Sequence, residues 1–387
     1  MLVAGEASGD ALGAGLMGAL QTLTGGAVRF SGVGGPQMEA RGLASLFPMQ
    51  ELSLMGIMEV LLRVPQLMRR LREVEDHALA SGPDAVVTID SPGFNFRLAR
   101  RLKPQKLNLI HYVAPTVWAW KAGRARKIAP LFDHLLTLLP FEPPYFEVEG
   151  LRSTFVGHPV IETGAGKGDG TAFRARHSLA SATPLLCILP GSRRSESSRL
   201  LPPFGETARR LGAQVPGLTV VVPAVPHLEA DIRAAVAAWK LPAIILPGNT
   251  EKYDAMAAAN SAIAASGTVA LELALARTPT VVAYKLHPLT WMLVRRMARS
   301  PYVHLVNILL KRPVVPELLQ GNCTPERLTE AVLTLLNDPV ARNRQRSAGA
   351  EALAALTPAA GSPSMAAAEA VLKVIDGRMP ASTARAD

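Results

Sequence analysis

The sequence has few cysteines and few aromatic residues: two of its 387 residues are cysteine and only 5% are aromatic. Cys187 and Cys323 lack the spacing of metal ligands, so we predict neither a disulfide framework nor a zinc site and expect a reducing compartment. Cys187 lies in an apolar run, where a buried structural thiol is the usual state. Few aromatic residues and no recognised nucleic-acid motif argue against a nucleic-acid-binding module, although the basic charge permits one.

Several other features are missing. No apolar run approaches the roughly 18 residues of a membrane-spanning helix, and no basic segment precedes an apolar one as in a secretory signal. The sequence has no P-loop, no HExxH pair of histidines and no DxD pair of carboxylates. We therefore expect a chain that does not span a membrane and a chemistry that needs neither a metal nor a cofactor.

Hydrophobic residues make up 49% of the chain, and its net charge of +10 favours an anionic partner. Short apolar runs alternate with helical patterns, which is typical of parallel α/β sheets. In the first half the strands are expected at 2–4, 28–30, 85–89, 107–112, 135–139 and 154–156. In the second half they are expected at 185–189, 218–222, 243–246, 262–264 and 280–283.

We predict an α/β protein with two Rossmann-like, doubly wound domains that face a cleft. The first domain is assigned to residues 1–161, and the Gly-rich stretch 162–171 is assigned to a linker without secondary structure. The second domain is assigned to residues 172–356. Residues 357–387 are expected to form a helix that returns to the first domain and a frayed tail.

In the first half, polar residues follow two predicted strands at their carboxyl ends, where ligands of such sheets bind. Glu6 and Ser8 lie in the turn after the first strand, and Asp90 directly follows the strand at 85–89. Asp90 either faces a substrate or caps the next helix, and we favour the substrate. Gly13, Gly15 and Gly18 match the letters GxGxxG but lie inside the first helix, so we interpret them as packing positions and not as a dinucleotide site.

In the second half, two strands run into Gly-containing turns that start helices. The first turn contains Gly191, Ser192 and Arg193, and the second contains Ser266, Gly267 and Thr268, with Glu272 one helical turn later. Two helix N-termini with free N–H groups and an arginine indicate a phosphate or diphosphate site.

Residues 52–72 are rich in Leu, Met, Val and Ile but contain four arginines. Two interpretations stay open: the segment packs in the core, or it forms a surface that dips into an anionic bilayer or holds acyl chains. For the second interpretation we select Met55, Ile57, Met58, Leu61, Leu62, Arg69 and Arg70.

Taken together, six motifs in order resemble the lipid-A-disaccharide synthase family. They are Ala4–Asp10, Val113–Trp120, Phe155–Pro159, Leu189–Arg193, Ala265–Thr268, and Asn307 with Pro316–Gln320. The sequence has Ala114 and Thr116 where the family more often has serine. Another UDP-sugar enzyme of similar fold, such as a UDP-N-acetylglucosamine epimerase, is the main alternative, although it would have no use for an apolar, arginine-rimmed segment.

The resemblance implies a GT-B-type fold and an inverting, metal-independent glycosyl transfer. UDP-2,3-diacylglucosamine would be joined to 2,3-diacylglucosamine 1-phosphate, called lipid X, through a β-1,6 bond with release of UDP. It also implies a peripheral protein on the cytoplasmic face of the inner membrane, attracted by anionic lipid, and leaves a homodimer open. No nucleic-acid partner is expected.

The resemblance also implies roles for individual residues. Asp90 would be the general base, with Glu6 as a second carboxylate that competes for this role, and Arg193 would neutralise the departing UDP. UDP would be bound by Gly191, Ser192, Arg193, Ser266, Gly267, Thr268, Glu272, Asn307, Glu317 and Gln320. The acceptor or sugar would be contacted by Ser8, Asn95, Trp118 and His158.

Overall fold

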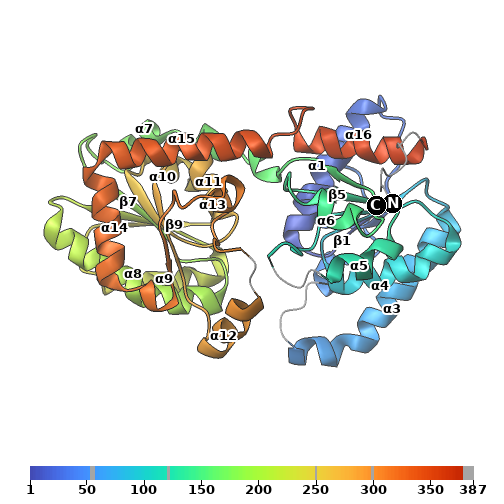
Figure 1. Ribbon diagram of the computed structural model, residues 1–387, viewed down its shortest axis with the longest axis horizontal. Helices are drawn as coiled ribbons and strands as arrows, with labels where there is room; N and C mark the ends of the chain where they lie inside the picture. Colours follow the sequence, from blue (N-terminus) through green and yellow to red (C-terminus); the bar gives the residue numbers. More distant parts are fainter. Residues whose placement is uncertain (53–56, 120–122, 249–250, 298–299, 378–387) are drawn as a thin grey trace. The chain divides into compact units, whose positions relative to one another are not determined.

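The computed structural model describes residues 1–52, 57–119, 123–248, 251–297 and 300–377 (Figure 1). The chain forms two units, one of Met1–Pro159 with Leu356–Asp387 and one of Val160–Ala355. Each unit has a six-stranded sheet in which every pair of neighbouring strands is parallel. The prediction of two doubly wound α/β halves is therefore confirmed.

The first sheet has the order β2-β1-β3-β4-β5-β6. Its strands are β1 Leu2–Ala4, β2 Gly32–Val33, β3 Val86–Ile89, β4 Leu109–Tyr112, β5 His134–Thr137 and β6 Ser153–Phe155. Its main helices are α1 Ala7–Leu23, α2 Pro36–Glu39, α3 Ile57–Ser81, α4 Pro92–Leu102, α5 Arg124–Ile128, α6 Pro143–Glu147 and α16 Pro363–Ile375. The direction of winding reverses between β1 and β3, which makes the carboxyl ends of these two strands the switch point of the sheet.

The second sheet has the order β12-β11-β10-β7-β8-β9, with its switch point between β7 and β10. Its strands are β7 Leu185–Leu189, β8 Thr219–Ala224, β9 Ala243–Pro247, β10 Ser261–Ala265, β11 Thr280–Tyr284 and β12 Glu317–Leu319. Its helices are α7 Gly170–Arg176, α8 Arg194–Gln214, α9 Glu229–Ala237, α10 Lys252–Ala258, α11 Val269–Leu275, α12 Pro288–Met297, α13 Leu305–Leu310, α14 Pro325–Asn337 and α15 Pro339–Leu356.

The second sheet is covered by apolar layers on both faces, as the continuous apolar run of β7 predicts. Successive side chains of a strand point to opposite faces. Leu186 and Ile188 pack into one cluster with residues of α8, α9 and α14. Leu185 and Cys187 pack on the other face, against α7, α10 and α11. Cys187 is fully buried, so the prediction of a structural thiol is confirmed.

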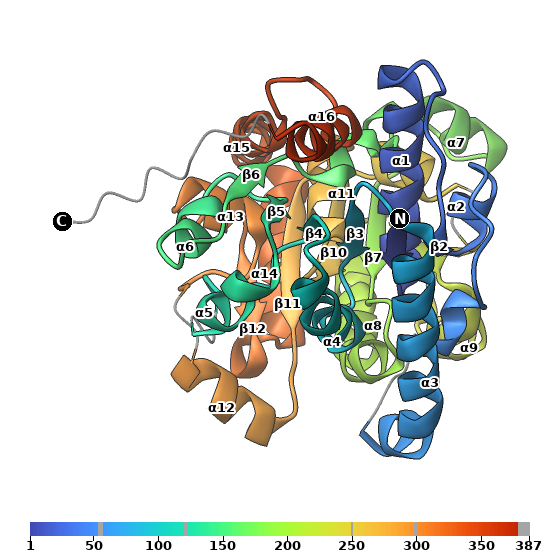
Figure 2. The same cartoon turned by 90° about the vertical axis from the view of Figure 1, so that its right-hand side faces the viewer.

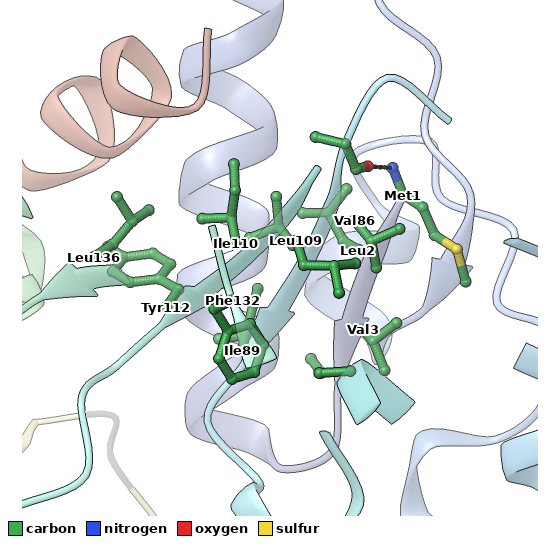
Figure 3. Packing of buried hydrophobic residues seen from close by; sticks show 14 of the residues in the cluster. Met1, Leu2, Val3, Val86, Ile89, Leu109, Ile110, Tyr112, Phe132 and Leu136 are labelled. Atoms are coloured by element: carbon green, nitrogen blue, oxygen red, sulfur yellow. Dashed lines mark hydrogen bonds between the residues drawn. The ribbon is translucent and has the colours of Figure 1, made fainter. Parts of the chain in front are cut away.

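The core of the first unit is built around the adjacent strands β1, β3, β4 and β5 (Figure 3). The β1 strand is anchored at its start, because the Met1 amino group donates to the Ala85 carbonyl oxygen at 2.8 Å. The pairing of Leu2 with both Gly32 and Val87 places β1 in the interior of the sheet. Glu6, two residues after β1, and Asp90, directly after β3, thereby come to the same edge of the sheet.

The C-terminal helix α16 belongs to the first unit, as predicted, and it packs against α1 (Figure 2). Glycines of the GxGxxG match lie where residues of other segments pack closely against α1. A Cβ atom added to Gly15 would lie 2.5 Å from Ser364 Oγ, and one added to Gly13 would lie 2.4 Å from Met38 Sδ. The interpretation of these glycines as packing positions is confirmed.

Three predictions of secondary structure were wrong. Residues 28–30 are not a strand, and β2 instead consists of Gly32–Val33. Gly32 has φ +128 and lies so close to β1 that an added Cβ would be 1.9 Å from the Leu2 oxygen, a fit that apolar patterning does not reveal. The strand β12 was missed. The stretch 162–171 contains a short 3-10 helix, Ala165–Lys167, and the start of α7, and it packs on α10 and α11.

Candidate active site

Two hydrogen bonds of its backbone groups fix Asp90 at the end of β3. Its N–H donates to the Tyr112 oxygen at 2.9 Å, and its carbonyl oxygen accepts from Asn95 Nδ2 at 2.8 Å. Asp90 and Ser91 have φ values of +48 and +44, a conformation that is uncommon for residues other than glycine. Such backbone strain is concentrated at functional sites, so it is consistent with the substrate-facing interpretation of Asp90.

The Asp90 side chain is half-buried, and burial raises the pKa of its carboxyl group above the ordinary value, while a hydrogen bond from the Ser91 backbone partly offsets this rise. A carboxylate with a raised pKa is a better proton acceptor. Asp90 does not cap the next helix: α4 starts at Pro92, and the N-cap residue is Ser91.

A cavity of about 270 Å³ opens beside this strand end. Its polar lining comes from Glu6, Ser91 and Arg97. The rest of its wall is mostly apolar and is formed by Leu52, Val64, Leu67, Met68, Leu71, Pro92, Gly93 and Phe94. We call this cavity the α3–α4 groove, because most of its lining comes from these two helices.

The other residues predicted at the acceptor lie in different surroundings. Ser8 is exposed in the first turn of α1. Asn95 is fully buried, where it donates to the Ile89 and Asp90 oxygens and so supports the backbone of the strand end. His158 is also buried, and burial lowers the pKa of its imidazole to about 4. The burial of both side chains argues against a contact of either one with a substrate.

Trp118 is half-buried in the loop after β4, with its indole N–H directed at the Glu142 carboxylate at 3.1 Å. Its ring meets the Phe141 ring edge-on. Trp120, the second indole of the motif, lies outside the described residues.

The predicted apolar segment is divided by the structure. Met55 lies outside the described residues, and Ile57, Met58, Leu61 and Leu62 belong to the first turns of α3. Arg69 is exposed. Arg70, predicted as a membrane contact, instead pairs with Glu51 at 2.7 Å and lies over the Phe47 ring.

In the second unit, the two Gly-containing turns meet at one cavity of about 390 Å³ at the switch point of the sheet. Seven residues predicted to bind UDP line it: Gly191, Ser192, Arg193, Ser266, Gly267, Thr268 and Glu272. Gly191 has φ +103, and Gly267 has φ +154, so both turns use a backbone conformation that favours glycine.

The charged groups of this cavity are paired. The Arg193 side chain is 67% exposed and lies 3.0 Å from Glu196 Oε1. Glu272 accepts from Tyr253 at 3.1 Å and is paired with Lys252 at 2.5 Å. Lys252 was not predicted from the sequence, because it belongs to no motif and reaches the cavity from the start of α10.

Asn307, Glu317 and Gln320 use their side chains on the protein itself. The Asn307 oxygen accepts from the Val314 and Val315 N–H groups at 2.9 Å, and its nitrogen donates to the Val315 oxygen and to Glu317 at 2.8 Å. Glu317 also accepts from the backbone at residues 303 and 304. Gln320 pairs with the backbone of Leu286. In the structure these side chains therefore connect β12 and its flanking residues to neighbouring segments of the second unit.

Within the described ranges of the chain, no helix combines the length and the apolar character needed to cross a bilayer. Within the same ranges, no three side chains of His, Cys, Asp or Glu gather as a metal site would require.

Residues 1–370 match the family model of lipid-A-disaccharide synthetase. The chain belongs to the lipid-A-disaccharide synthase family. It is 55% identical over 380 residues to the lipid-A-disaccharide synthase of Rhodospirillum centenum, which covers 98% of this chain and 95% of the relative. It is 50% identical over 378 residues to that of Paramagnetospirillum magneticum, with 97% of both chains covered. As a member of the family it is a glycosyltransferase of lipid A biosynthesis with lipid-A-disaccharide synthase activity.

Solved structures support the GT-B fold. MurG of Acinetobacter baumannii matches with a TM-score of 0.57 at 13% identity, over 97% of this chain and 98% of the other. A putative UDP-N-acetylglucosamine 2-epimerase of Listeria monocytogenes matches with a TM-score of 0.67, also at 13% identity, over 100% and 99% of the two chains. At such identities these likenesses show the fold alone, so they do not favour the epimerase alternative over the synthase family.

Proposed function

We propose that this synthase joins UDP-2,3-diacylglucosamine to lipid X by inverting transfer, with Asp90 as the general base. The 6-hydroxyl oxygen of lipid X attacks the anomeric carbon of the donor and passes its proton to the Asp90 carboxylate. The bond from the anomeric carbon to the phosphate oxygen breaks, and UDP leaves with the electron pair. The observation that carries the proposal is the strained, half-buried Asp90 at the switch point of its sheet, with a raised carboxyl pKa.

The cavity between β7 and β10 is proposed to bind UDP. The turns at Gly191 and Gly267 precede α8 and α11, whose N-terminal N–H groups and dipoles favour a diphosphate. Arg193 is exposed and 3.0 Å from Glu196, so it would neutralise charge on the leaving UDP after moving only its own side chain. Glu272 is proposed to accept from the ribose while it stays paired with Lys252.

The α3–α4 groove is proposed to hold an acyl chain of lipid X. Its apolar wall and the polar rim of Glu6 and Arg97 fit a ligand with a hydrocarbon part and a polar head. Glu6 is proposed to orient the acceptor from this rim. Ser8 and Trp118 stay proposed sugar contacts. No observation on the described residues supports a homodimer.

We further propose that the protein is peripheral on the cytoplasmic face of the inner membrane, with the groove end of α3 against anionic lipid. Val64 and Arg69 are exposed on this helix, which is a pattern for shallow insertion beside anionic head groups. The double substitution Val64→Ser with Arg69→Ser should reduce sedimentation with phosphatidylglycerol vesicles. Val148→Ser changes an equally apolar residue, 79% exposed after α6, and is the matched control. Equal sedimentation of the two variants would contradict the placement on α3.

The proposed base is tested by Asp90→Asn. The variant should lose about 10²–10⁴ in turnover of UDP-2,3-diacylglucosamine with lipid X, because a positioned base contributes that much. Its affinity for UDP should be unchanged, because Asp90 belongs to the other unit. Asp84→Asn, at the opposite end of β3 and exposed, is the matched control. Turnover of the Asp90 variant within a few-fold of the parent protein would remove Asp90 from the role of base.

A further inference from the structure

Glu142 is a buried acidic residue that the mechanism does not use. It follows β5 by a few residues, stands at the N-cap of α6, and is only 3% exposed. A buried carboxyl group is costly unless its oxygens are hydrogen-bonded. The contacts of Glu142 therefore indicate why an acid is placed there.

Three donors converge on the two oxygens of Glu142. The indole N–H of Trp118 donates to Oε1 at 3.1 Å. The backbone N–H groups of Leu138 and Leu139 donate to Oε2 at 3.1 and 3.0 Å. The carboxylate thus ties the loop after β4, which carries Trp118, to the turn after β5.

The chemistry of the contacts selects a carboxylate. An ionised acid accepts at both oxygens, whereas a glutamine of the same shape has one oxygen and one NH₂ group that cannot accept. No ion pair is formed by Glu142 among the residues that the structure describes. Burial consequently raises the pKa of its carboxyl to about 7, although the three hydrogen bonds oppose this rise.

The loop that Glu142 holds is connected to Asp90 through the sheet. The Asp90 N–H donates to the Tyr112 oxygen at the end of β4, and the next residue, Val113, donates to the Leu136 oxygen in β5. Val113 has φ +83, which is strained for a β-branched residue. The path of the chain from β4 to Trp118 therefore starts in a conformation that needs support from its surroundings.

We propose that Glu142 is a positioning residue for the transfer reaction, which sets the orientation of Trp118 and of the loop 113–119 for binding of the acceptor sugar. The proposal rests on the proposed function, in which Trp118 contacts the acceptor. Glu142 itself touches no substrate. Its effect passes through the indole N–H of Trp118, which donates to Glu142. The face of the Trp118 ring is then the surface offered to the sugar.

The test uses Glu142→Gln, with Glu147→Gln on the exposed side of α6 as the matched control. The Glu142 variant should raise the KM for lipid X about tenfold, since one hydrogen bond to a charged group is lost. Its KM for the donor and its kcat should stay within about twofold. Trp118→Phe keeps the buried carboxylate, removes the indole N–H together with the five-membered ring that carries it, and should raise the same KM. The double variant should be no worse than the poorer single one, because both changes break one contact.

A spectroscopic arm separates this proposal from the proposed function. The indole N–H signal of Trp118, identified by its absence in Trp118→Phe, should shift in Glu142→Gln and stay in place in Glu147→Gln. Equal rises in the KM for donor and acceptor, additive effects in the double variant, or an unmoved indole signal would each overturn the positioning role. If the parent protein formed no disaccharide while the indole signal still shifted in Glu142→Gln, the proposed reaction would be overturned. The contact between Trp118 and Glu142 would remain established.

Discussion

Replacement of His111 by phenylalanine should destabilise the protein at neutral pH and stabilise it at mildly acidic pH. His111 is a fully buried residue of β4, with its ring stacked on Phe132 and edge-on to Phe96. Its Nδ1 lies 2.8 Å from the Thr88 hydroxyl. Burial lowers the pKa of its imidazole from 6.5 to about 3, so the folded protein keeps it neutral where the unfolded chain binds a proton.

The magnitude follows from this difference in pKa. A histidine with a lowered folded pKa contributes full stability above 6.5, and that stability is lost as the pH falls from 6.5 towards 3. Each pH unit in this window costs about 1.4 kcal/mol, so acidification from about pH 7 to about pH 5 costs about 2 kcal/mol. Phenylalanine keeps the ring contacts and loses the Thr88 hydrogen bond, which costs about 1 kcal/mol at every pH.

His111→Phe should therefore be about 1 kcal/mol less stable than the parent at neutral pH and about 1 kcal/mol more stable at about pH 5. Urea unfolding of both proteins at the two pH values measures this. His134 and His158, whose imidazole pKa values are each lowered to about 4, affect both proteins equally and cancel in the comparison. The reasoning is refuted if the two proteins lose the same free energy of unfolding on acidification.

Two further predictions concern the second unit. Arg193→Ala should weaken UDP binding about tenfold in calorimetry, as expected for loss of a hydrogen bond to a charged group. It should leave stability nearly unchanged, because the Arg193 side chain of the ion pair with Glu196 is 67% exposed. Unchanged UDP affinity would count against the phosphate assignment. Asn307→Ala should lower the free energy of unfolding by about 3 kcal/mol, because it leaves buried backbone groups without partners; a melting temperature equal to the parent's would show that this segment is held by other contacts.

The strands that carry the candidate sites were predictable because they are apolar runs that end in polar or glycine turns. Asp90, Gly191 and Ser266 were found in this way, since the carboxyl end of a parallel strand can be read from local sequence. The short strands β2 and β12 were not predictable in this way. The position of β2 depends on the close fit of Gly32 against Leu2, and β12 is held by a pairing with β11, and both are contacts between segments distant in sequence.

Side-chain roles that depend on tertiary neighbours were the least predictable part. Arg70 looked like a membrane contact because nothing near it in sequence shows that Glu51 and Phe47 will surround it. Asn307 was recognised within a motif, but its hydrogen bonds to the backbone required the fold. Glu142 stands between a phenylalanine and two prolines and reads as part of a surface turn, so only its burial and its contact with Trp118 reveal its importance.

The return of α16 to the first unit determines which of the two units can be completed first during synthesis. The whole of Val160–Ala355 is synthesised after Pro159 and before α16, so the second unit is complete while α1 still lacks the helix that covers it. During that interval a nascent chain would expose the apolar side of α1 to solvent and to chaperones. Cleavage or premature termination in the link before α16 would therefore damage the unit that contains Asp90 and leave the other one whole.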